Sequence, residues 1–219
     1  YADHRDLHSC PTRRSSELGA AGQPWIYRSD VLAEPDAGAG VAAVRDRRGK
    51  FLGQALYSPR SEIRLRLIEP TERPIDRAWW VERIRGALER RRGIDATAYR
   101  VVHGEGDGLP SLIVDRYDRW VVAQLLSAGL ETMRDDVVAA IVEVTGAVGV
   151  LLRNDAGVRR HEGLTEAVEL VHGTVPTSIE VREAEIRLLV APWTGQKTGA
   201  FLDPRPNRII AAALARPEG

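Results

Sequence analysis

The centre of the chain is organised by the stretch Tyr99-Arg-Val-Val-His-Gly-Glu-Gly-Asp-Gly-Leu-Pro-Ser-Leu-Ile-Val-Asp-Arg-Tyr117. Residues 99–103 and 112–115 are rich in β-branched and apolar side chains, which predicts two strands. The glycine-rich loop between them is not followed by a helical pattern, and its spacing differs from the Gly-x-Gly-x-x-Gly of dinucleotide-binding loops. The stretch therefore predicts two neighbouring strands joined by a β–β connection.

Acidic residues accompany this loop, namely Glu105, Asp107 and Asp115. Carboxylates could bind a cation there, but a solvated acidic loop is the simpler interpretation. A small-molecule enzyme that uses Glu105 and Asp107 is the least favoured of the functions considered, and it predicts a metal or ligand at the loop.

The segments that follow mix strand and helix patterns. Met133, Val137, Ile141 and Val144 have the spacing of one helix face, and Gly146 ends that helix. Further strands are expected at 120–126, 148–153, 179–181 and 186–190. The order strand, strand, helix, strand, strand predicts an α+β domain in which a helix covers one side of a sheet.

Upstream, residues 19–72 are expected to form a small β-barrel-like module. Strands are predicted at 41–45, 51–57 and 63–67, with a polar turn at 46–50. Apolar and basic residues alternate over 63–67, so we expect Arg64 and Arg66 to lie on an exposed face.

A helix is predicted at 76–92, between the two β-rich parts. Asp76 is a suitable N-cap, and Trp80, Ile84 and Leu88 form the buried stripe. Arginines, with Arg85 among them, occupy its exposed sides and its C-terminal end, where cations suit the helix dipole.

Composition limits the possible functions of this chain of 219 residues, which has 43% apolar residues and a net charge of zero. The charge is +5 over 19–100, −7 over 101–190 and +2 over 191–219, so a locally basic surface stays possible while a globally basic one is excluded. One cysteine excludes an internal disulfide and a cysteine-cluster metal site. No apolar run approaches the roughly 18 residues of a membrane span.

The first 18 residues are expected to lie outside the fold. They have no helical or strand period, and Asp6–Leu18 resembles the translation of a common sequencing-adapter oligonucleotide, apart from Cys10 and Glu17. The alternative is a genuine disordered N-terminal arm. A metal site built from His4, His8 and Cys10 would be a false lead.

The C-terminal part contains Thr194-Gly-Gln-Lys-Thr-Gly-Ala-Phe-Leu-Asp-Pro-Arg-Pro-Asn-Arg208. This stretch resembles the Gly-Gln-Lys-Thr-Gly-Phe-Phe-Leu-Asp-Gln-Arg-x-x-Arg motif of S-adenosylmethionine (SAM)-dependent RNA methyltransferases of the ribosomal RNA large subunit methyltransferase I type. It departs from that motif at Ala200 and Pro204. Further stretches match the same family in order: 22–27, 51–57, 99–117, 153–155 and 162–164.

The resemblance covers residues 19 to about 215 and implies a domain order. The expected parts are a non-native leader at 1–18, a PUA RNA-binding domain at 19–74, a linker helix at 75–96, a central α+β domain at 97–191, and the start of a truncated Rossmann-like methyltransferase domain at 192–219. In the family, the glycine-rich SAM loop and the nucleophilic cysteine lie downstream of the motif. We therefore expect an N-terminal fragment with no catalytic residue and no metal site, inactive by itself.

For the complete enzyme, the resemblance implies transfer of a methyl group from SAM to C5 of a cytosine in 23S ribosomal RNA. A cysteine thiolate first adds to C6 of the base, which is covalent catalysis. Residues expected beside SAM or the substrate are Lys197, Thr198, Phe201, Asp203, Arg205 and Arg208, because a Gly-flanked loop that leads into a helix can present N–H groups and cations. Residues expected to bind RNA are Trp25, Arg64, Arg66 and Arg85.

The expected partner is ribosomal RNA in the cytoplasm, with no membrane, and a homodimer is compatible with the sequence. The alternative function is a stand-alone PUA-type RNA-binding protein without enzyme activity. The nucleotide sequence beyond codon 219 separates the two, because the enzyme needs a continuing frame with a glycine-rich loop and a cysteine motif.

Overall fold

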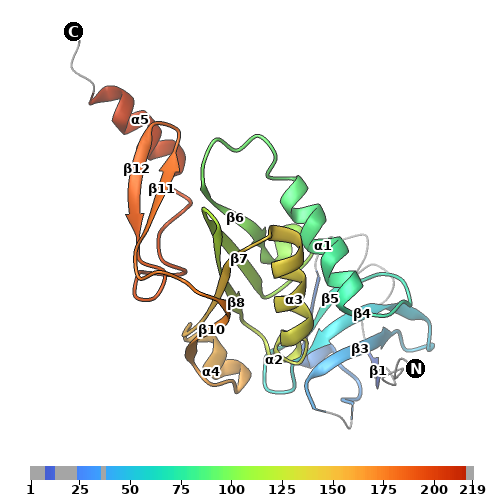
Figure 1. Ribbon diagram of the computed structural model, residues 1–219. Helices are drawn as coiled ribbons and strands as arrows, with labels where there is room; N and C mark the ends of the chain where they lie inside the picture. Colours follow the sequence, from blue (N-terminus) through green and yellow to red (C-terminus); the bar gives the residue numbers. More distant parts are fainter. Residues whose placement is uncertain (1–7, 13–23, 36–37, 216–219) are drawn as a thin grey trace.

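The computed structural model describes residues 8–12, 24–35 and 38–215 of the chain (Figure 1). The N-terminal part is a five-stranded sheet in the order β1-β3-β4-β5-β2. Its strands are β1 (His8–Pro11), β2 (Trp25–Tyr27), β3 (Gly40–Arg45), β4 (Phe51–Tyr57) and β5 (Ile63–Glu69), with a short 3-10 turn η2 (Arg28–Asp30). The strands predicted at 41–45, 51–57 and 63–67 are confirmed.

The pairing of β1 corrects one expectation. His8–Pro11 pair in parallel with residues 42–45 of β3, and Cys10 is fully buried beside Ile26 and Val44. The open edge of β3 offers unpaired backbone N–H and C=O groups, which a short extended segment can satisfy. Placing residues 1–18 outside the fold is therefore wrong for His8–Thr12, while 1–7 and 13–18 lie outside the described residues.

The central part is a second five-stranded sheet in the order β10-β9-β8-β7-β6. Its elements are β6 (Ala98–His103), the 3-10 turn η3 (Gly104–Asp107), β7 (Leu112–Tyr117), β8 (Trp120–Leu125), α2 (Ala128–Glu131), α3 (Arg134–Thr145), β9 (Gly149–Asn154), α4 (Val158–Glu162) and β10 (Ala167–Gly173). The predicted β–β connection and the helix that ends at Gly146 are confirmed.

The helix expected as a linker belongs to the core of the central part. Asp76 caps α1 (Arg77–Glu89) by accepting a hydrogen bond from the Trp79 amide. α1 lies with α3 on one face of the central sheet, and Trp80 and Ile84 join its apolar core (Figure 1). The residues packed there alternate along the strands, with Val121 and Ala123 of β8 facing the helices.

The opposite face of this sheet is covered by the last part of the chain. Val122 and Leu151 pack there against β11 (Ile179–Glu183) and β12 (Ile186–Val190), an antiparallel hairpin. A loop leads from β12 to α5 (Arg205–Leu214), which lies at one end of the molecule (Figure 1). The helix expected after the Gly-flanked loop is confirmed as α5.

The two sheets are joined by a buried polar contact. Arg66 of β5 donates to Glu162 of α4 at 2.8 Å, and both side chains are buried. Gly129 of α2 touches the end of β4 so closely that a Cβ there would lie 2.8 Å from the carbonyl oxygen of Tyr57. Only glycine allows this approach.

Candidate functional site

The loop between β12 and α5 holds the motif Thr194–Arg208 in a compact, strained conformation. The amide of Gly199 donates to the carbonyl oxygen of Gln196 at 2.9 Å, and a Cβ at Gly195 would collide with the backbone of Gly199. Lys197 has a φ of 56°, a left-handed conformation that costs a non-glycine residue energy. The motif glycines are therefore needed to fold the loop back on itself.

Thr198 anchors this loop to the central sheet. Its hydroxyl donates to Oδ2 of Asp115 at 2.6 Å and lies 2.9 Å from the hydroxyl of Tyr117. Since the only hydroxyl hydrogen of Thr198 goes to Asp115, Tyr117 is the donor in the second contact. All three residues are fully buried, so Thr198 points into the protein instead of toward a ligand.

Asp115 is held from its other side by Arg100. Two hydrogen bonds, of 2.8 and 2.9 Å, join the guanidinium to both carboxylate oxygens. This hydrogen bonding raises the pKa of Arg100 above its usual value against the opposing effect of burial. Burial, and then the nearby Asp115 carboxylate, raise the pKa of Tyr117 to about 12, so this hydroxyl stays protonated and able to donate.

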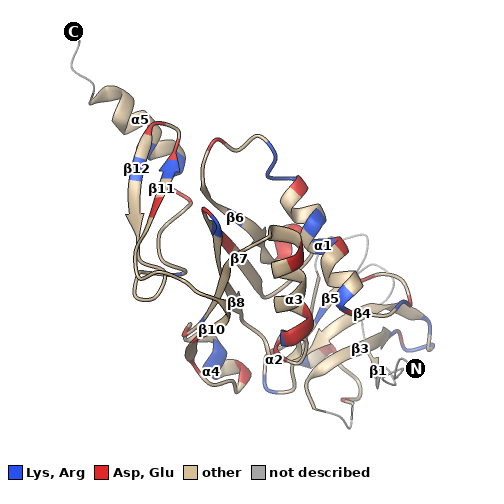
Figure 2. Ribbon diagram, viewed as in Figure 1, with Lys and Arg blue, Asp and Glu red and all other residues tan. Residues whose placement is uncertain are grey.

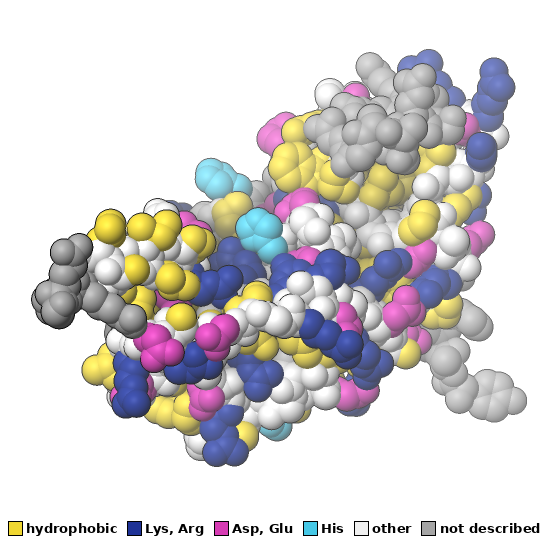
Figure 3. Space-filling model, turned by 90° about the horizontal axis from the view of Figure 1, so that it is seen from above, with side chains coloured by type: hydrophobic (Ala, Val, Ile, Leu, Met, Phe, Trp, Pro, Cys, Tyr) yellow, Lys and Arg dark blue, Asp and Glu magenta, His cyan; other side chains and the backbone are white. Residues whose placement is uncertain are grey.

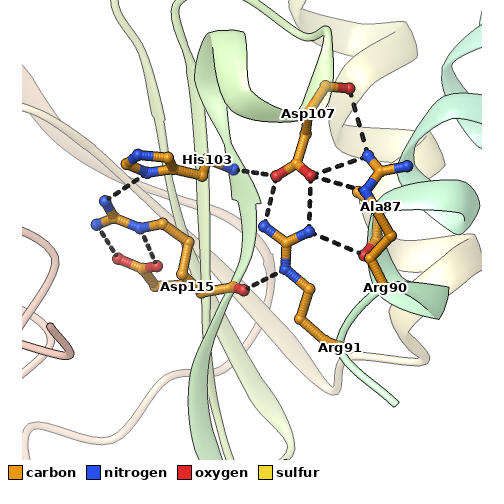
Figure 4. Close-up of polar contacts among 7 residues, drawn as sticks. Ala87, Arg90, Arg91, His103, Asp107 and Asp115 are labelled. Carbon is orange, nitrogen blue, oxygen red and sulfur yellow. Dashed lines mark hydrogen bonds and ion pairs between the residues drawn. The ribbon is translucent and has the colours of Figure 1, made fainter. Parts of the chain in front are cut away.

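The glycine-rich turn η3 is fixed in the same way by the end of α1 (Figure 4). Arg91 donates to both oxygens of Asp107 at 2.6 Å, Arg90 donates at 2.8 Å, and the backbone amide of His103 adds a third donor at 2.6 Å. Burial opposes ionisation of Asp107, but these donors outweigh it and hold its pKa below the usual range. The interpretation of a solvated acidic loop is thus wrong for Asp107 and Asp115, because arginines neutralise both.

One chain of polar contacts connects these features, and Figure 4 shows its part around Arg91, His103 and Asp115. The ring Nδ1 of His103 accepts a hydrogen bond of 3.3 Å from Arg100, which also holds Asp115 and through it Thr198. The carbonyl oxygen of Arg100 accepts from Arg91 at 3.1 Å. The end of α1, the turn η3 and the motif loop are consequently positioned together.

The exposed side of the motif loop brings three predicted residues together. The ammonium of Lys197 lies 4.3 Å from the ring centre of Phe201 and 3.4 Å from Oδ1 of Asp203. A hydrogen bond within Asp203 itself and then Lys197 lower the pKa of that exposed carboxyl. Arg205 begins α5 without an ion pair among the described residues.

Arg208 contacts this group only through the backbone, because its Nη1 donates to the carbonyl oxygen of Phe201 at 3.1 Å. It makes two hydrogen bonds, of 2.6 and 2.7 Å, to the buried carboxylate of Glu183 at the end of β11. Arg208 therefore fastens α5 to the hairpin. Two of the six residues expected beside the cofactor, Thr198 and Arg208, instead make contacts within the protein that hold its elements together.

Of the four residues predicted to bind RNA, two are buried and two are at least partly accessible. Arg64 and Arg66 are buried, because Glu34 and Glu162 cover the face of β5 that was expected to be exposed. Their expected exposure is wrong. Arg85 is exposed, and the indole of partly buried Trp25 donates to Glu105 of the turn η3 at 3.1 Å.

Sequence reasoning missed the roles of Arg100, Tyr117 and Glu183. One signal was present, since a carboxylate inside the apolar strand that contains Asp115 must find a buried partner. Nothing in the sequence indicated that this partner would be a threonine 83 positions away.

Figure 3 shows Lys and Arg side chains across the middle of this face, beginning beside the apolar end of the molecule, with Asp and Glu side chains among them. Within the described ranges, no group of three or more His, Cys, Asp or Glu residues is arranged to hold a metal ion. None of the described helices is long and apolar enough to cross a membrane.

Comparison with known proteins first identifies a domain and a shared fold. Residues 19–70 match the family model of a PUA-like domain. A solved structure from Streptococcus mutans, described as a candidate SAM-dependent methyltransferase, superposes with a TM-score of 0.76 over 92% of this chain and 53% of its own, at 20% identity. A second, a candidate methyltransferase complexed with SAH, also has a TM-score of 0.76, at 21% identity. These two establish a shared fold.

Sequence relatives show which proteins this chain resembles over most of its length. Proteins named "Ribosomal RNA large subunit methyltransferase I" from Alteromonas mediterranea and Vibrio vulnificus are 38% and 37% identical over 88% and 84% of this chain. The resemblance to that family is confirmed. The chain spans about half the length of these relatives, 50% and 48%.

Proposed function

We propose that this chain is the RNA-positioning part of a SAM-dependent methyltransferase that acts on cytosine C5 of 23S ribosomal RNA in the cytoplasm. The observation that carries the proposal is the motif loop, which is anchored on the central sheet through Thr198 and Asp115 and leaves Lys197, Phe201 and Asp203 together on its outer side. A PUA-like sheet on the same molecule supports RNA as the substrate.

We assign different roles to the motif residues. Lys197, Phe201, Asp203 and Arg205 line the SAM or substrate cleft of the complete enzyme, since their side chains are not used to hold the fold together. Thr198 and Arg208 act as positioning residues, because their polar atoms bind Asp115 and Glu183.

The nucleophile of this chemistry lies outside the chain in our proposal. A cysteine that adds to C6 of cytosine must be accessible and must form a thiolate. Cys10 is fully buried, and burial, followed by the charge of Glu34, raises its pKa to about 11. Its sulfur is therefore held as an inert thiol, and the relatives' extra length can hold the reactive one.

The exposed apolar side chains of helix α5 are consistent with a further, catalytic domain that packs against them. Its apolar side chains lack a partner among the described residues, with Ile210 59% and Leu214 82% exposed. Apolar helix faces of this kind are normally buried against another layer. We propose that α5 is the first helix of a Rossmann-like domain that covers this face.

A methyl-transfer assay tests the proposal that the catalytic residues lie outside this chain. The chain is incubated with 23S ribosomal RNA and SAM that carries a labelled methyl group. We expect no label in the RNA, whereas incorporation would overturn the proposal that the chemistry lies elsewhere. A reading frame that continues beyond codon 219 into a glycine-rich loop and a cysteine motif supports the enzyme, and a frame that stops favours a stand-alone RNA-binding protein.

A further inference from the structure

The turn between β3 and β4 is a rigid platform for cations. The carboxylate of Asp46 accepts hydrogen bonds from the amides of Arg48 and Lys50 at 2.8 and 2.9 Å. Gly49 takes a φ of 81°, and its carbonyl oxygen accepts from the guanidinium of Arg45 at 3.2 Å. These contacts fix the backbone of the turn, so the Cα atoms of the residues at its tip have defined positions.

Three cations at this tip make no ion pair with any other described residue. Arg47, Arg48 and Lys50 are exposed, and within the described part of the chain no carboxylate lies within ion-pair distance of them. Most arginines of the protein are engaged differently, as Arg64 and Arg66 are in their buried pairs. The charge at the turn is therefore free to act on a partner.

The turn lies far from the motif loop. The other end of β4, at Tyr57, meets Gly129 of the central part. Since β4 has seven residues, and each advances the strand by about 3.3 Å, the turn lies about 20 Å beyond that junction. Figure 2 shows basic residues at the outer tip of the β3–β4 hairpin. A partner that touches both places must be extended.

We propose that Arg47, Arg48 and Lys50 bind the sugar-phosphate backbone of the RNA substrate, at a distance from the target base. The inference rests on the proposed function. Arginine forks and a lysine ammonium match phosphate oxygens, and a fixed turn loses little entropy when it binds them. Such contacts hold the RNA in register without reading its sequence.

The test replaces all three residues, as Arg47→Gln, Arg48→Gln and Lys50→Gln, and leaves Asp46 and Gly49 in place. The matched control, Arg28→Gln, Arg60→Gln and Arg119→Gln, removes three exposed cations elsewhere that likewise make no ion pair among the described residues. Binding to a fluorescent structured fragment of 23S ribosomal RNA and to an unrelated RNA hairpin is measured by anisotropy at several salt concentrations. Thermal unfolding confirms that both variants are folded.

We expect the turn variant to bind both RNAs at least about tenfold more weakly at low salt, with a salt-dependence slope about 2 to 3 lower than that of the native chain, because each of the three phosphate contacts contributes about 0.7 to 0.9. Arg47→Lys with Arg48→Lys should keep the native slope. An unchanged slope in the turn variant, or an equal loss in the control, overturns the inference but leaves the proposed function standing. A native chain that binds neither RNA at low salt overturns both.

Discussion

The hydroxyl of Thr198 donates to the carboxylate of Asp115 at 2.6 Å, and neither side chain is accessible to solvent. The contact joins the motif loop to the strand β7 of the central sheet. It explains why a threonine follows the strained Lys197, since the hydroxyl is the feature that fixes the loop. The motif is thus partly a structural device, and its outer side chains are free for ligands.

Thr198→Val removes the hydroxyl and nearly keeps the side chain's size. We expect it to lower the free energy of unfolding by about 1 to 3 kcal/mol, because Asp115 loses a hydrogen-bond donor in a buried site. Chemical denaturation measures this loss. Thr198→Ser is the matched control and should stay within about 1 kcal/mol of the native chain; equal losses for the two variants would show that the hydroxyl is not the anchor.

Glu183→Gln weakens the attachment of α5 to the β11–β12 hairpin. The Glu183 carboxylate makes two short hydrogen bonds to Arg208, and such charge-assisted pairs are the stronger ones. We expect faster amide hydrogen exchange over 205–214, with no change in α1. Arg187→Gln, which removes an exposed charge from β12, should leave α5 unchanged; if exchange in α5 is the same in all three proteins, the pair does not hold the helix.

Arg66→Met tests the junction between the two sheets. It leaves Glu162 buried without its cationic partner, which typically costs about 3 to 5 kcal/mol. The exposed Arg85→Ala should cost less than about 0.5 kcal/mol. Denaturant unfolding of the two variants compares them. Near-native stability for Arg66→Met would contradict the structural role given to this arginine.

The carboxyl of Glu69 makes stability depend on pH. Burial opposes its ionisation, but hydrogen bonds from Thr71, Trp79 and Arg83 outweigh it and lower its pKa from 4.5 to about 2. Because the folded-state pKa is depressed, the stabilisation is fully present above about pH 4.5 and is lost as the pH falls through about 2.

Glu69→Gln should therefore reduce stability at neutral pH and flatten the decline of stability between pH 4.5 and 2. Thermal unfolding across this range measures the effect. Glu72→Gln is the control, because the Glu72 carboxylate is exposed and its Oε1 lies 3.7 Å from Nη2 of Arg45, too far for a strong hydrogen bond. If the native chain and Glu69→Gln lose stability in parallel as the pH falls, the Glu69 carboxyl is not the cause of the pH dependence.

Local patterns predicted most of the fold, and tertiary contacts explain where they did not suffice. The spacing of Trp80 and Ile84 and the N-cap Asp76 predicted α1, because these signals lie within one helix. β10 and α4 were missed. Burial alternates along β10, but the exposed positions include Val168 and Leu170 while Glu169 is partly buried, so the burial does not follow the apolar residues. Helix α4 has only five residues.

The candidate site was predicted less completely, because its polar contacts join distant segments. The alternation around Arg64 and Arg66 indicates two faces of a strand but does not reveal that Glu34 and Glu162 cover one of them. The family motif located the loop correctly as a unit. It could not show that the Thr198 and Arg208 side chains turn inward while those of Lys197 and Phe201 meet outside.

Binding of this chain to 23S ribosomal RNA, followed as the salt concentration rises from about 50 to about 200 mM, tests the central claim most directly. RNA held by arginine and lysine contacts to phosphates should bind measurably at low salt and lose at least tenfold in affinity over this range. Absence of binding at low salt, or an affinity that does not change with salt, would contradict the account of the chain as the RNA-positioning part of a methyltransferase.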